Sequence, residues 1–432
     1  MSAREFDPHI SIDPIAHAKD GDYCIKQIEI EHIRQKIETP FKVLAGNGIN
    51  EDDVAPISGM ISQPFVEYQK FVSDVRSWNS LYRLLNEAGP DRVHGLDSFF
   101  HIKKKMWNSA LTTVSLVFPR NPFMEFSTVT EGKRRTFPGL DENSYICLLD
   151  YVHSASKAFV LCPDVRLEKR NDITTTQYLS FVDQSIKVLM DRNNRPIFVP
   201  LHIELSKKNL EAILSHYKTQ GYTNIWVDFD AKTCHGTYSS RLKTIIHLID
   251  RIMGNSNATL YFSHIKKEIL PNIQEDRAAA SDILTQFYGA DFIGTDREPW
   301  RRPQFNWNND DALREMASKH NFPSKEAYLE AHVLHKHRIF DPDSYYYLNL
   351  DHYPQSLPIS NTALLKDNAL NQFLNSTLMH LEVERTKKTI GETQSVKKYL
   401  NTKAAIQENP DIMDNIVIPQ KAPDLMDFLG NL

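Results

Sequence analysis

The fold is decided by the stretch Tyr288-Gly289-Ala290-Asp291-Phe292-Ile293-Gly294-Thr295-Asp296-Arg297-Glu298-Pro299. A short apolar run leads directly into acidic and basic residues. This pattern is typical of the last strand of a parallel barrel as it enters a loop. In (β/α)8 barrels the chemistry is kept at the C-terminal ends of the strands.

Four earlier segments end in the same way, with an apolar run followed by an acid or a histidine. They end at Asp164, at His202 and Glu204, at Asp228 and Asp230, and at His264. We therefore expect these side chains to gather at one end of a barrel.

Strands and helices alternate from residue 112 onward, which predicts βαβ units and a parallel sheet. The predicted strands are 112–118, 157–163, 195–203, 223–230, 258–264 and 290–295, and the helices between them are 141–155, 174–190, 206–219, 238–253 and 276–288. Residues 42–47 and 57–61 complete a set of eight strands. A doubly wound open sheet is the competing architecture, but no Gly-rich phosphate loop follows the first strand.

The predicted fold class is therefore α/β, a (β/α)8 TIM-like barrel with extra N-terminal strands and a C-terminal helical region. We expect an N-terminal extension over 1–40, the barrel over 41–300, an aromatic and helical region over 301–405 packed on it, and a flexible tail over 406–432. Residues 64–89 show helical periodicity.

Composition limits the class of protein. The 432 residues are 41% hydrophobic and 24% charged, as in an ordinary globular protein. The net charge of −5 excludes a wholly basic nucleic-acid binder, so any such contact must come from local patches. No apolar run is long enough for a membrane span, and the N-terminus has no signal-peptide pattern. The four cysteines form no CxxC pair. Together these points predict a cytoplasmic protein without a metal or cofactor.

Several segments resemble the tRNA-guanine transglycosylases, especially their archaeal branch. The matching segments are 38–44, with Thr39-Pro40 opening the barrel, Leu161-Cys162-Pro163-Asp164, residues 196–202, residues 221–227, Gly289-Ala290-Asp291-Phe292, and the helix from Asn368 through Glu392. The resemblance covers roughly 38–300 and 360–395, and it implies a barrel that acts on a nucleobase, with Asp164 in the base-reading position.

The chain departs from that family at its chemical groups. The zinc module is absent, and the family's double glycines are replaced by His202-Ile203-Glu204 and Asp228-Phe229-Asp230. Gly294 stands where the resemblance places the nucleophilic aspartate, and the other catalytic aspartate is replaced within residues 118–121. These departures favour hydrolytic removal of a base, or altered exchange, over the usual double displacement.

Cleavage of an N-glycosidic bond needs a carboxylate near the sugar and a proton donor near the leaving base. Asp296 is the first candidate for the carboxylate, Asp291 the second, and Asp228 and Asp230 share one strand face. We predict that Asp164, His202, Glu204 and His264 bind the base. Each acid taken alone is more often a helix cap or a loop ion pair.

Clusters of cations and aromatic rings predict contact with DNA or tRNA, in which a base would leave its stack to reach the barrel. The residues are Arg120, Arg134, Arg135, Arg297, Trp300, Arg301 and Arg302. A solvated surface is the alternative for each cluster. The tail is a candidate docking segment for a protein partner, and a homodimer stays open.

Two other functions remain in view. The chain could be a non-catalytic, partner-binding member of the same fold. It could also be an unrelated metal-dependent barrel hydrolase that uses His202, Asp228, Asp230 and His264.

Overall fold

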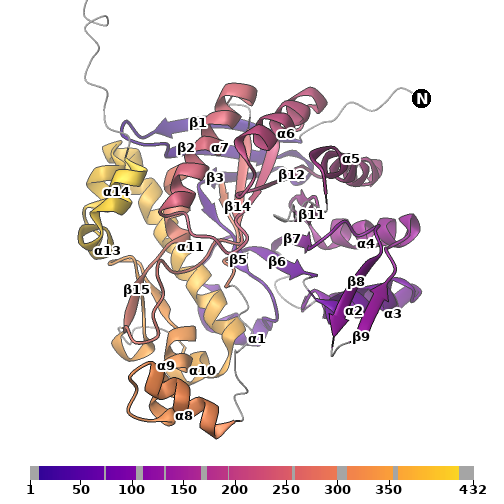
Figure 1. Ribbon diagram of the computed structural model, residues 1–432. Helices are drawn as coiled ribbons and strands as arrows, with labels where there is room; N and C mark the ends of the chain where they lie inside the picture. The colour runs from indigo at the N-terminus through magenta and orange to yellow at the C-terminus, as the bar shows by residue number, and fades with distance from the viewer. Residues whose placement is uncertain are drawn as a thin grey trace, which may run out of the picture.

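The computed structural model describes residues 9–72, 74–103, 110–130, 133–166, 173–192, 194–254, 258–298, 309–353 and 359–417. Within these residues eight parallel strands form a barrel (Figure 1). The strands are β4 (Phe41–Lys42) with β5 (Leu44–Ala45), β6 (Phe65–Phe71), β7 (Leu111–Phe118), β10 (Val160–Leu161) with β11 (Asp164–Val165), β12 (Ile197–His202), β13 (Asn224–Asp228), β14 (Thr259–Ser263) and β16 (Phe292–Ile293).

Strand pairing closes the ring. β5 pairs with β6, β6 with β7 and β7 with β11, all in parallel. From β10 the parallel order continues through β12, β13, β14 and β16. β16 then pairs with β4, where Phe292 lies opposite Phe41. Because the first and fourth strands each change partner part-way along, two hydrogen-bonded sheets join into one barrel, and the predicted fold class is confirmed.

Helices surround the barrel between its strands. They are α1 (Glu51–Ser58), α2 (Val75–Leu85), α3 (Gly89–Phe99), α4 (Glu142–Ala155), α5 (Thr175–Arg192), α6 (Lys207–Gln220) and α7 (Thr237–Met253). A hairpin of β8 (Phe126–Thr130) and β9 (Lys133–Phe137) precedes α4, and β15 (Arg277–Ala279) with a 3-10 helix (Asp282–Tyr288) precedes β16.

The C-terminal region supplies the helix that covers the first strand. It contains α8 (Asp310–Lys319), α9 (Lys325–Lys336), β17 (Ile339–Asp341), β18 (Tyr346–Leu348), α10 (Asn361–Lys366), α11 (Asn368–Thr393), α12 (Val396–Leu400), α13 (Ala404–Glu408) and α14 (Pro410–Ile416). The long α11 lies along β4 and β5 (Figure 1). Ser376 accepts a hydrogen bond from the Ala45 amide at 3.2 Å.

Aromatic side chains fill the N-terminal half of the barrel. The set is Phe41, Phe65, Phe159, Phe198, Trp226, Tyr261 and Phe292, one from each of seven strands or their starts. The three-stranded antiparallel sheet of β1 (Ile10–His17), β2 (Cys24–Ile30) and β3 (Gln35–Thr39) packs on the same cluster through Ile28, Ile30 and Ile37. Packed apolar side chains therefore close the barrel interior at this end, whereas polar side chains follow the strands at the C-terminal end.

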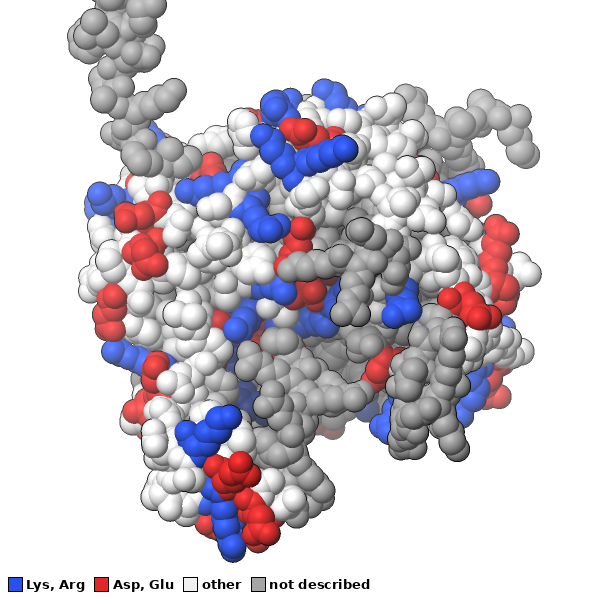
Figure 2. Space-filling model, viewed as in Figure 1, with Lys and Arg blue, Asp and Glu red and all other residues white. Residues whose placement is uncertain are grey.

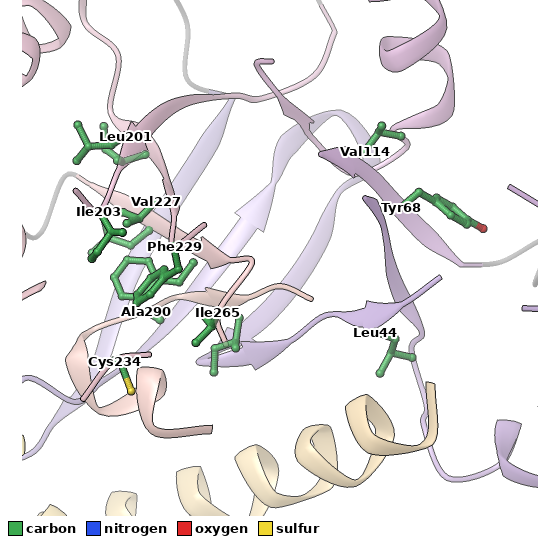
Figure 3. Close-up of a cluster of buried hydrophobic side chains, with 14 of the residues drawn as sticks. Leu44, Tyr68, Val114, Leu201, Ile203, Val227, Phe229, Cys234, Ile265 and Ala290 are labelled. Atoms are coloured by element: carbon green, nitrogen blue, oxygen red, sulfur yellow. The ribbon is translucent and has the colours of Figure 1, made fainter. Parts of the chain in front are cut away.

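A second core lies between the strands and their helices. Leu201 of β12, Val227 of β13 and Phe229, which follows β13, project into it, with Ile265 and Cys234 nearby (Figure 3). Cys162 and Cys234 are both buried and all four cysteines are free thiols. No described helix is both long and apolar enough to cross a membrane.

Three predictions of local structure were wrong. Residues 65–71 form β6 rather than the start of a helix, and helix α2 begins only after Asp74, which caps it by accepting the Ser77 amide at 2.7 Å. Residues 51–58 are helix α1, so 57–61 is no strand. The 276–288 segment is β15 and a 3-10 helix.

The helical periodicity assigned to residues 64–89 was wrong over β6, because apolar side chains lie on both faces of this strand. Its inward side chains, Phe65, Glu67, Gln69 and Phe71, alternate with Val66 and Tyr68, which face the outer core. The tail is also more regular than expected up to α14, where Ile412 and Ile416 are buried. The remainder of the tail lies outside the described residues.

Gly294 permits the close packing at the barrel centre. A Cβ at this position would lie 2.4 Å from Glu67 Oε2, 2.6 Å from Ser263 Cβ and 2.7 Å from the Tyr261 hydroxyl. We predict that Gly294→Ala lowers the free energy of unfolding by about 1–3 kcal/mol through overpacking. Urea unfolding measures this loss. Gly59→Ala is the control, because no atom lies within 4 Å of its added methyl group. Equal stabilities of the two variants would contradict the prediction.

Candidate functional site

A histidine held between two carboxylates forms the centre of the C-terminal end of the barrel. His264 follows β14, and its Nδ1 lies 2.8 Å from Asp228 Oδ1 at the end of β13. Its Nε2 lies 3.6 Å from Glu67 Oε1 on β6 and 3.0 Å from Ser115 Oγ on β7. All four side chains are fully buried. The structure thus brings together two predicted residues, Asp228 and His264, with two that were not predicted.

The two carboxylates decide the charge of this histidine. Burial alone would lower the pKa of His264, but Asp228 and Glu67 outweigh burial and raise that pKa to about 9. Burial would raise the pKa of Asp228, yet His264 brings it down to about 2. In the same way His264 holds the pKa of Glu67 below its usual value despite burial. At neutral pH the group is an imidazolium between two carboxylates.

Glu67 was missed because its strand was assigned to a helix. Its Oε2 accepts the Tyr261 hydroxyl at 2.7 Å and the Thr295 amide at 2.7 Å. Alternation of Phe65, Glu67, Gln69 and Phe71 after Pro64 was the signal that would have found it, since period-two alternation indicates a strand.

The order Ser115, His264, Asp228 has the distances of a nucleophilic triad, but its protonation does not fit one. A general base must have an unprotonated nitrogen facing the hydroxyl. With a pKa near 9, His264 is protonated at neutral pH and has no lone pair for the Ser115 proton. The arrangement does not favour serine nucleophilic chemistry.

Asp164 differs from Asp228 in its protonation state. Burial raises the pKa of Asp164, and the charge of nearby Asp228 adds to it, giving a pKa of about 8. Its Oδ1 accepts the Val165 amide at 2.8 Å and the Tyr178 hydroxyl at 3.1 Å. At neutral pH Asp164 is therefore a protonated acid beside an ionised carboxylate.

Asp230 lies beyond the end of β13 in a clasp of basic groups. Arg297 Nη1 lies 2.6 Å from Asp230 Oδ1, and Arg166 forms an ion pair with the same oxygen. His202 Nε2 lies 3.9 Å from Oδ2. The ring of Phe71 supports Arg297, whose guanidinium carbon is 3.5 Å from the ring centre.

The backbone is left-handed at three non-glycine residues of this region. The φ angles are +44° at Asp230, +58° at Ala231 and +59° at His264. Left-handed non-glycine residues are uncommon and cluster at functional sites, because the surrounding structure must hold them there. The Ala231 amide donates to the His264 carbonyl at 2.8 Å, which ties the three residues together.

Buried polar atoms without a hydrogen-bond partner gather at the same end of the barrel. Among the described residues they include Glu67 Oε1, Gln69 Oε1, Asp164 Oδ2, Arg166 Nε, His202 Nε2, Asp228 Oδ2 and Thr295 Oγ1. Buried polar groups are almost always paired in native proteins. A concentration of unpaired donors and acceptors at one place is typical of a site that receives a polar ligand.

The two first-ranked catalytic candidates, Asp291 and Asp296, lie at opposite ends of the barrel. Asp291 is at the opposite, N-terminal end, where it pairs with Lys26 at 3.0 Å and accepts the Leu260 amide at 2.8 Å. It is therefore part of the barrel's closed end. Asp296 lies at the C-terminal end, where its backbone forms an isolated parallel β-bridge with Ile265. Its carbonyl oxygen accepts a hydrogen bond from Gln69 Nε2 at 3.3 Å.

The predicted nucleic-acid residues are only partly placed. Arg120 is exposed after β7, and Arg134 and Arg135 lie in β9, whose hairpin precedes α4. Trp300, Arg301 and Arg302 lie outside the described residues. On the face in Figure 2, basic and acidic side chains of the described residues are interspersed rather than gathered in one basic area.

One group of side chains has metal-like spacing. Ligand atoms of His202, Glu204 and Asp230 lie within 4.8 Å of one another. Two observations disfavour a cation there. His202 Nδ1 accepts the Glu204 amide at 3.1 Å, so in the neutral ring Nε2 bears the proton and cannot ligate. Arg166 and Arg297 already place positive charge on Asp230.

Two cavities lie away from these residues. One of about 380 Å³ lies near the closed end of the barrel, lined in part by Phe41, Gly59 and His380. Another of about 520 Å³ lies between α3 and α4, lined in part by Val93 and Tyr151. Neither contains the unpaired polar atoms, so the chemistry of the side chains rather than cavity size identifies the candidate site.

No family model matches this sequence, and no curated protein matches it. Several solved structures overlap with this chain at low similarity. The carboxyl transferase domain of Rhizobium etli pyruvate carboxylase has 9% identity and a TM-score of 0.35, over 79% of this chain and 48% of that one. A Cellulomonas fimi endo-β-1,4-mannanase has 12% identity and a TM-score of 0.33, over 61% and 68%.

Morphinone reductase has 9% identity and a TM-score of 0.30, over 60% of this chain and 84% of that one. This chain spans about half the length of the carboxyl transferase chain it matches. Such low scores add nothing to the strand pairings and carry no activity over to this protein. The resemblance to tRNA-guanine transglycosylases stays a prediction.

The protonation of Asp164 predicts a pH-dependent stability difference. A carboxyl group whose pKa is raised from 3.8 to about 8 on folding holds a proton that the unfolded chain releases. Stability therefore falls as pH rises from about 4 to 8. Asp164→Asn removes this dependence. The free energy of unfolding of Asp164→Asn minus that of the wild type should be more than about 1 kcal/mol larger at pH 8 than at pH 5.

Urea unfolding at both pH values checks this difference. Asp150→Asn, on an exposed ion pair with Arg192, is the control and should show no such gain. A constant difference between wild type and Asp164→Asn would mean that Asp164 is ionised in the folded protein.

Proposed function

We propose that this protein is an enzyme that accepts an unpaired nucleobase of DNA or tRNA at the C-terminal end of its barrel and cleaves the N-glycosidic bond. The observation that carries the proposal is the pair Asp164 and Asp228. One is protonated and the other ionised at neutral pH, and each has one buried oxygen without a partner among the described residues. Pairs of carboxyl groups with divided pKa values are typical of glycosidic bond cleavage.

The two carboxyl groups match the charges that such a reaction develops. As the bond breaks, the sugar gains positive charge and the base gains negative charge. Asp228, kept ionised by His264, stabilises the sugar cation or aligns the attacking group. Asp164 donates its proton to the leaving base. Asp296 and Asp230 stay secondary candidates for the carboxylate, and Asp291 is left out because of its place at the closed end.

Unpaired hydrogen-bonding groups support a nucleobase as the bound group. Gln69 Oε1 is an unpaired acceptor, and the unpaired hydroxyl of Thr295 can donate as well as accept. The edge of a nucleobase offers both kinds of partner, and an enzyme that acts on a base must take it out of its stack. The resemblance to tRNA-guanine transglycosylases supports the same class of substrate. The bond is cleaved either by water, which leaves an abasic site, or by exchange for a free base.

Base release tests the proposal directly. The purified protein is incubated with unmodified and modified DNA and with tRNA, and free base and abasic sites are measured. Release that leaves an abasic site identifies a glycosylase, and release that requires an added free base identifies exchange. Binding without release from any substrate would overturn the proposal in favour of a non-catalytic, partner-binding protein.

Substitution of either carboxyl group should abolish most of the activity. We expect Asp228→Asn and Asp164→Asn each to lower the rate of base release by about 10²–10⁴-fold, the range for loss of a general acid or base. Asp150→Asn should retain the wild-type rate. Near-normal release by both site variants would contradict the assignment.

The rate of base release should fall as pH rises through about 8, because Asp164 then loses the proton that the leaving base requires. Asp228 titrates near pH 2 and adds no acid limb between pH 5 and 8. Single-turnover rates over pH 5–10 measure this profile. A rate that rises through pH 8 would exclude Asp164 as the acid.

A further inference from the structure

Three donors from different strands converge on one carboxylate. Arg166 follows β11, His202 ends β12 and Arg297 follows β16, yet all three face Asp230. The side chains of Arg166, Arg297 and Asp230 are 21%, 16% and 19% exposed. They are shielded but within reach of a ligand that enters the barrel mouth.

This cluster has more donors than its one carboxylate can satisfy. Arg166 and Arg297 both pair with the one carboxylate of Asp230, so these three side chains together carry a net charge of +1. Arg166 Nε and His202 Nε2 are buried and have no hydrogen-bond partner among the described residues. Glu204 adds no free charge to the cluster, since it accepts the Tyr238 hydroxyl at 3.1 Å and lies 3.9 Å from Lys232 Nζ. A second anion therefore fits here better than a cation.

The backbone that carries Asp230 is in an unfavourable conformation. Asp230 and Ala231 are consecutive non-glycine residues in the left-handed region, at φ +44° and +58°. Asp230 is also held close to the ionised Asp228, since its amide donates to Asp228 Oδ1 at 2.9 Å. Backbone strain and a neighbouring negative charge both favour release of the carboxylate once another anion can take the two arginines.

We propose that the carboxylate of Asp230 holds the place of a phosphate group, and that Arg166, Arg297 and His202 bind a phosphate of the substrate when Asp230 moves aside. The inference rests on the proposed function, because a nucleotide brings its backbone phosphate with the base. Paired guanidinium groups match the geometry of phosphate oxygens, and a protonated ring nitrogen supplies a further donor. Phe71 keeps Arg297 oriented for this contact through its ring face.

Inorganic phosphate is the probe. Its affinity is measured by isothermal titration calorimetry at pH 7.5 and constant ionic strength, for wild type, Asp230→Asn, Arg166→Gln and Arg297→Gln. Asn keeps the size of Asp but lacks the competing charge, so Asp230→Asn should bind phosphate at least tenfold more tightly than wild type. Either arginine substitution, introduced alongside Asp230→Asn, should remove this gain.

A matched ion pair serves as control. Arg385 forms an ion pair with Asp343 at 2.7 Å, far along the chain from the barrel mouth. Asp343→Asn should leave phosphate affinity at the wild-type value. If Asp230→Asn fails to fold, two arginine variants provide the test instead. The inference then requires that Arg297→Gln binds phosphate more weakly than Arg385→Gln does.

Equal phosphate affinity in wild type and Asp230→Asn, or a gain that survives loss of both arginines, would overturn the inference. This failure is separable from failure of the proposed function. Phosphate binding with the expected pattern but no base release from any polymer supports the phosphate site and overturns the enzyme. Base release with unchanged phosphate affinities supports the enzyme and overturns the phosphate site.

Discussion

The rest of the site depends on one buried interaction, the imidazolium of His264 between the carboxylates of Asp228 and Glu67. Placing three charges in a barrel interior costs much solvation free energy, which is recovered only where geometry and further hydrogen bonds are good. Tyr261 and the Thr295 amide supply those bonds to Glu67. Such a cluster is a poor way to stabilise a fold, and apolar side chains already fill the barrel below it. We therefore interpret it as serving chemistry.

The charge of this cluster determines the state of its neighbours. Two carboxylates and one imidazolium leave a net negative charge in a buried place. Asp164 keeps its proton beside this cluster, because burial and then the charge of Asp228 raise its pKa. A protonated acid and an ionised carboxylate thus lie side by side because burial and neighbouring charges act differently on the two groups.

Most of the barrel could be predicted from its sequence because buried parallel strands appear as short apolar runs. Asp164, His202, Asp228 and His264 were found because each ends such a run. Glu67 and Ser115 could not be found in this way, since they lie within strands and face the interior. The partnership of Arg166 and Arg297 with Asp230 joins residues 64 and 67 positions apart, which spacing along the chain does not reveal.

His202, Glu204 and Asp230 have the spacing of metal ligands, but their other partners disfavour a metal site. Spacing counts possible ligands, but it does not count the protons and cations that compete for them. Here the Glu204 amide takes the free lone pair of His202, and two guanidinium groups take Asp230. What remains unpaired on this side of the barrel mouth is a set of donors. The carboxyl groups of Asp164 and Asp228 lie beside these donors, since His202 pairs with Asp228 in the sheet and the Asp230 amide donates to Asp228 Oδ1 at 2.9 Å. A ligand that places an anionic group at the arginines therefore has its neighbouring atoms beside these two carboxyl groups, which suits a nucleotide, whose phosphate and glycosidic bond are attached to one sugar.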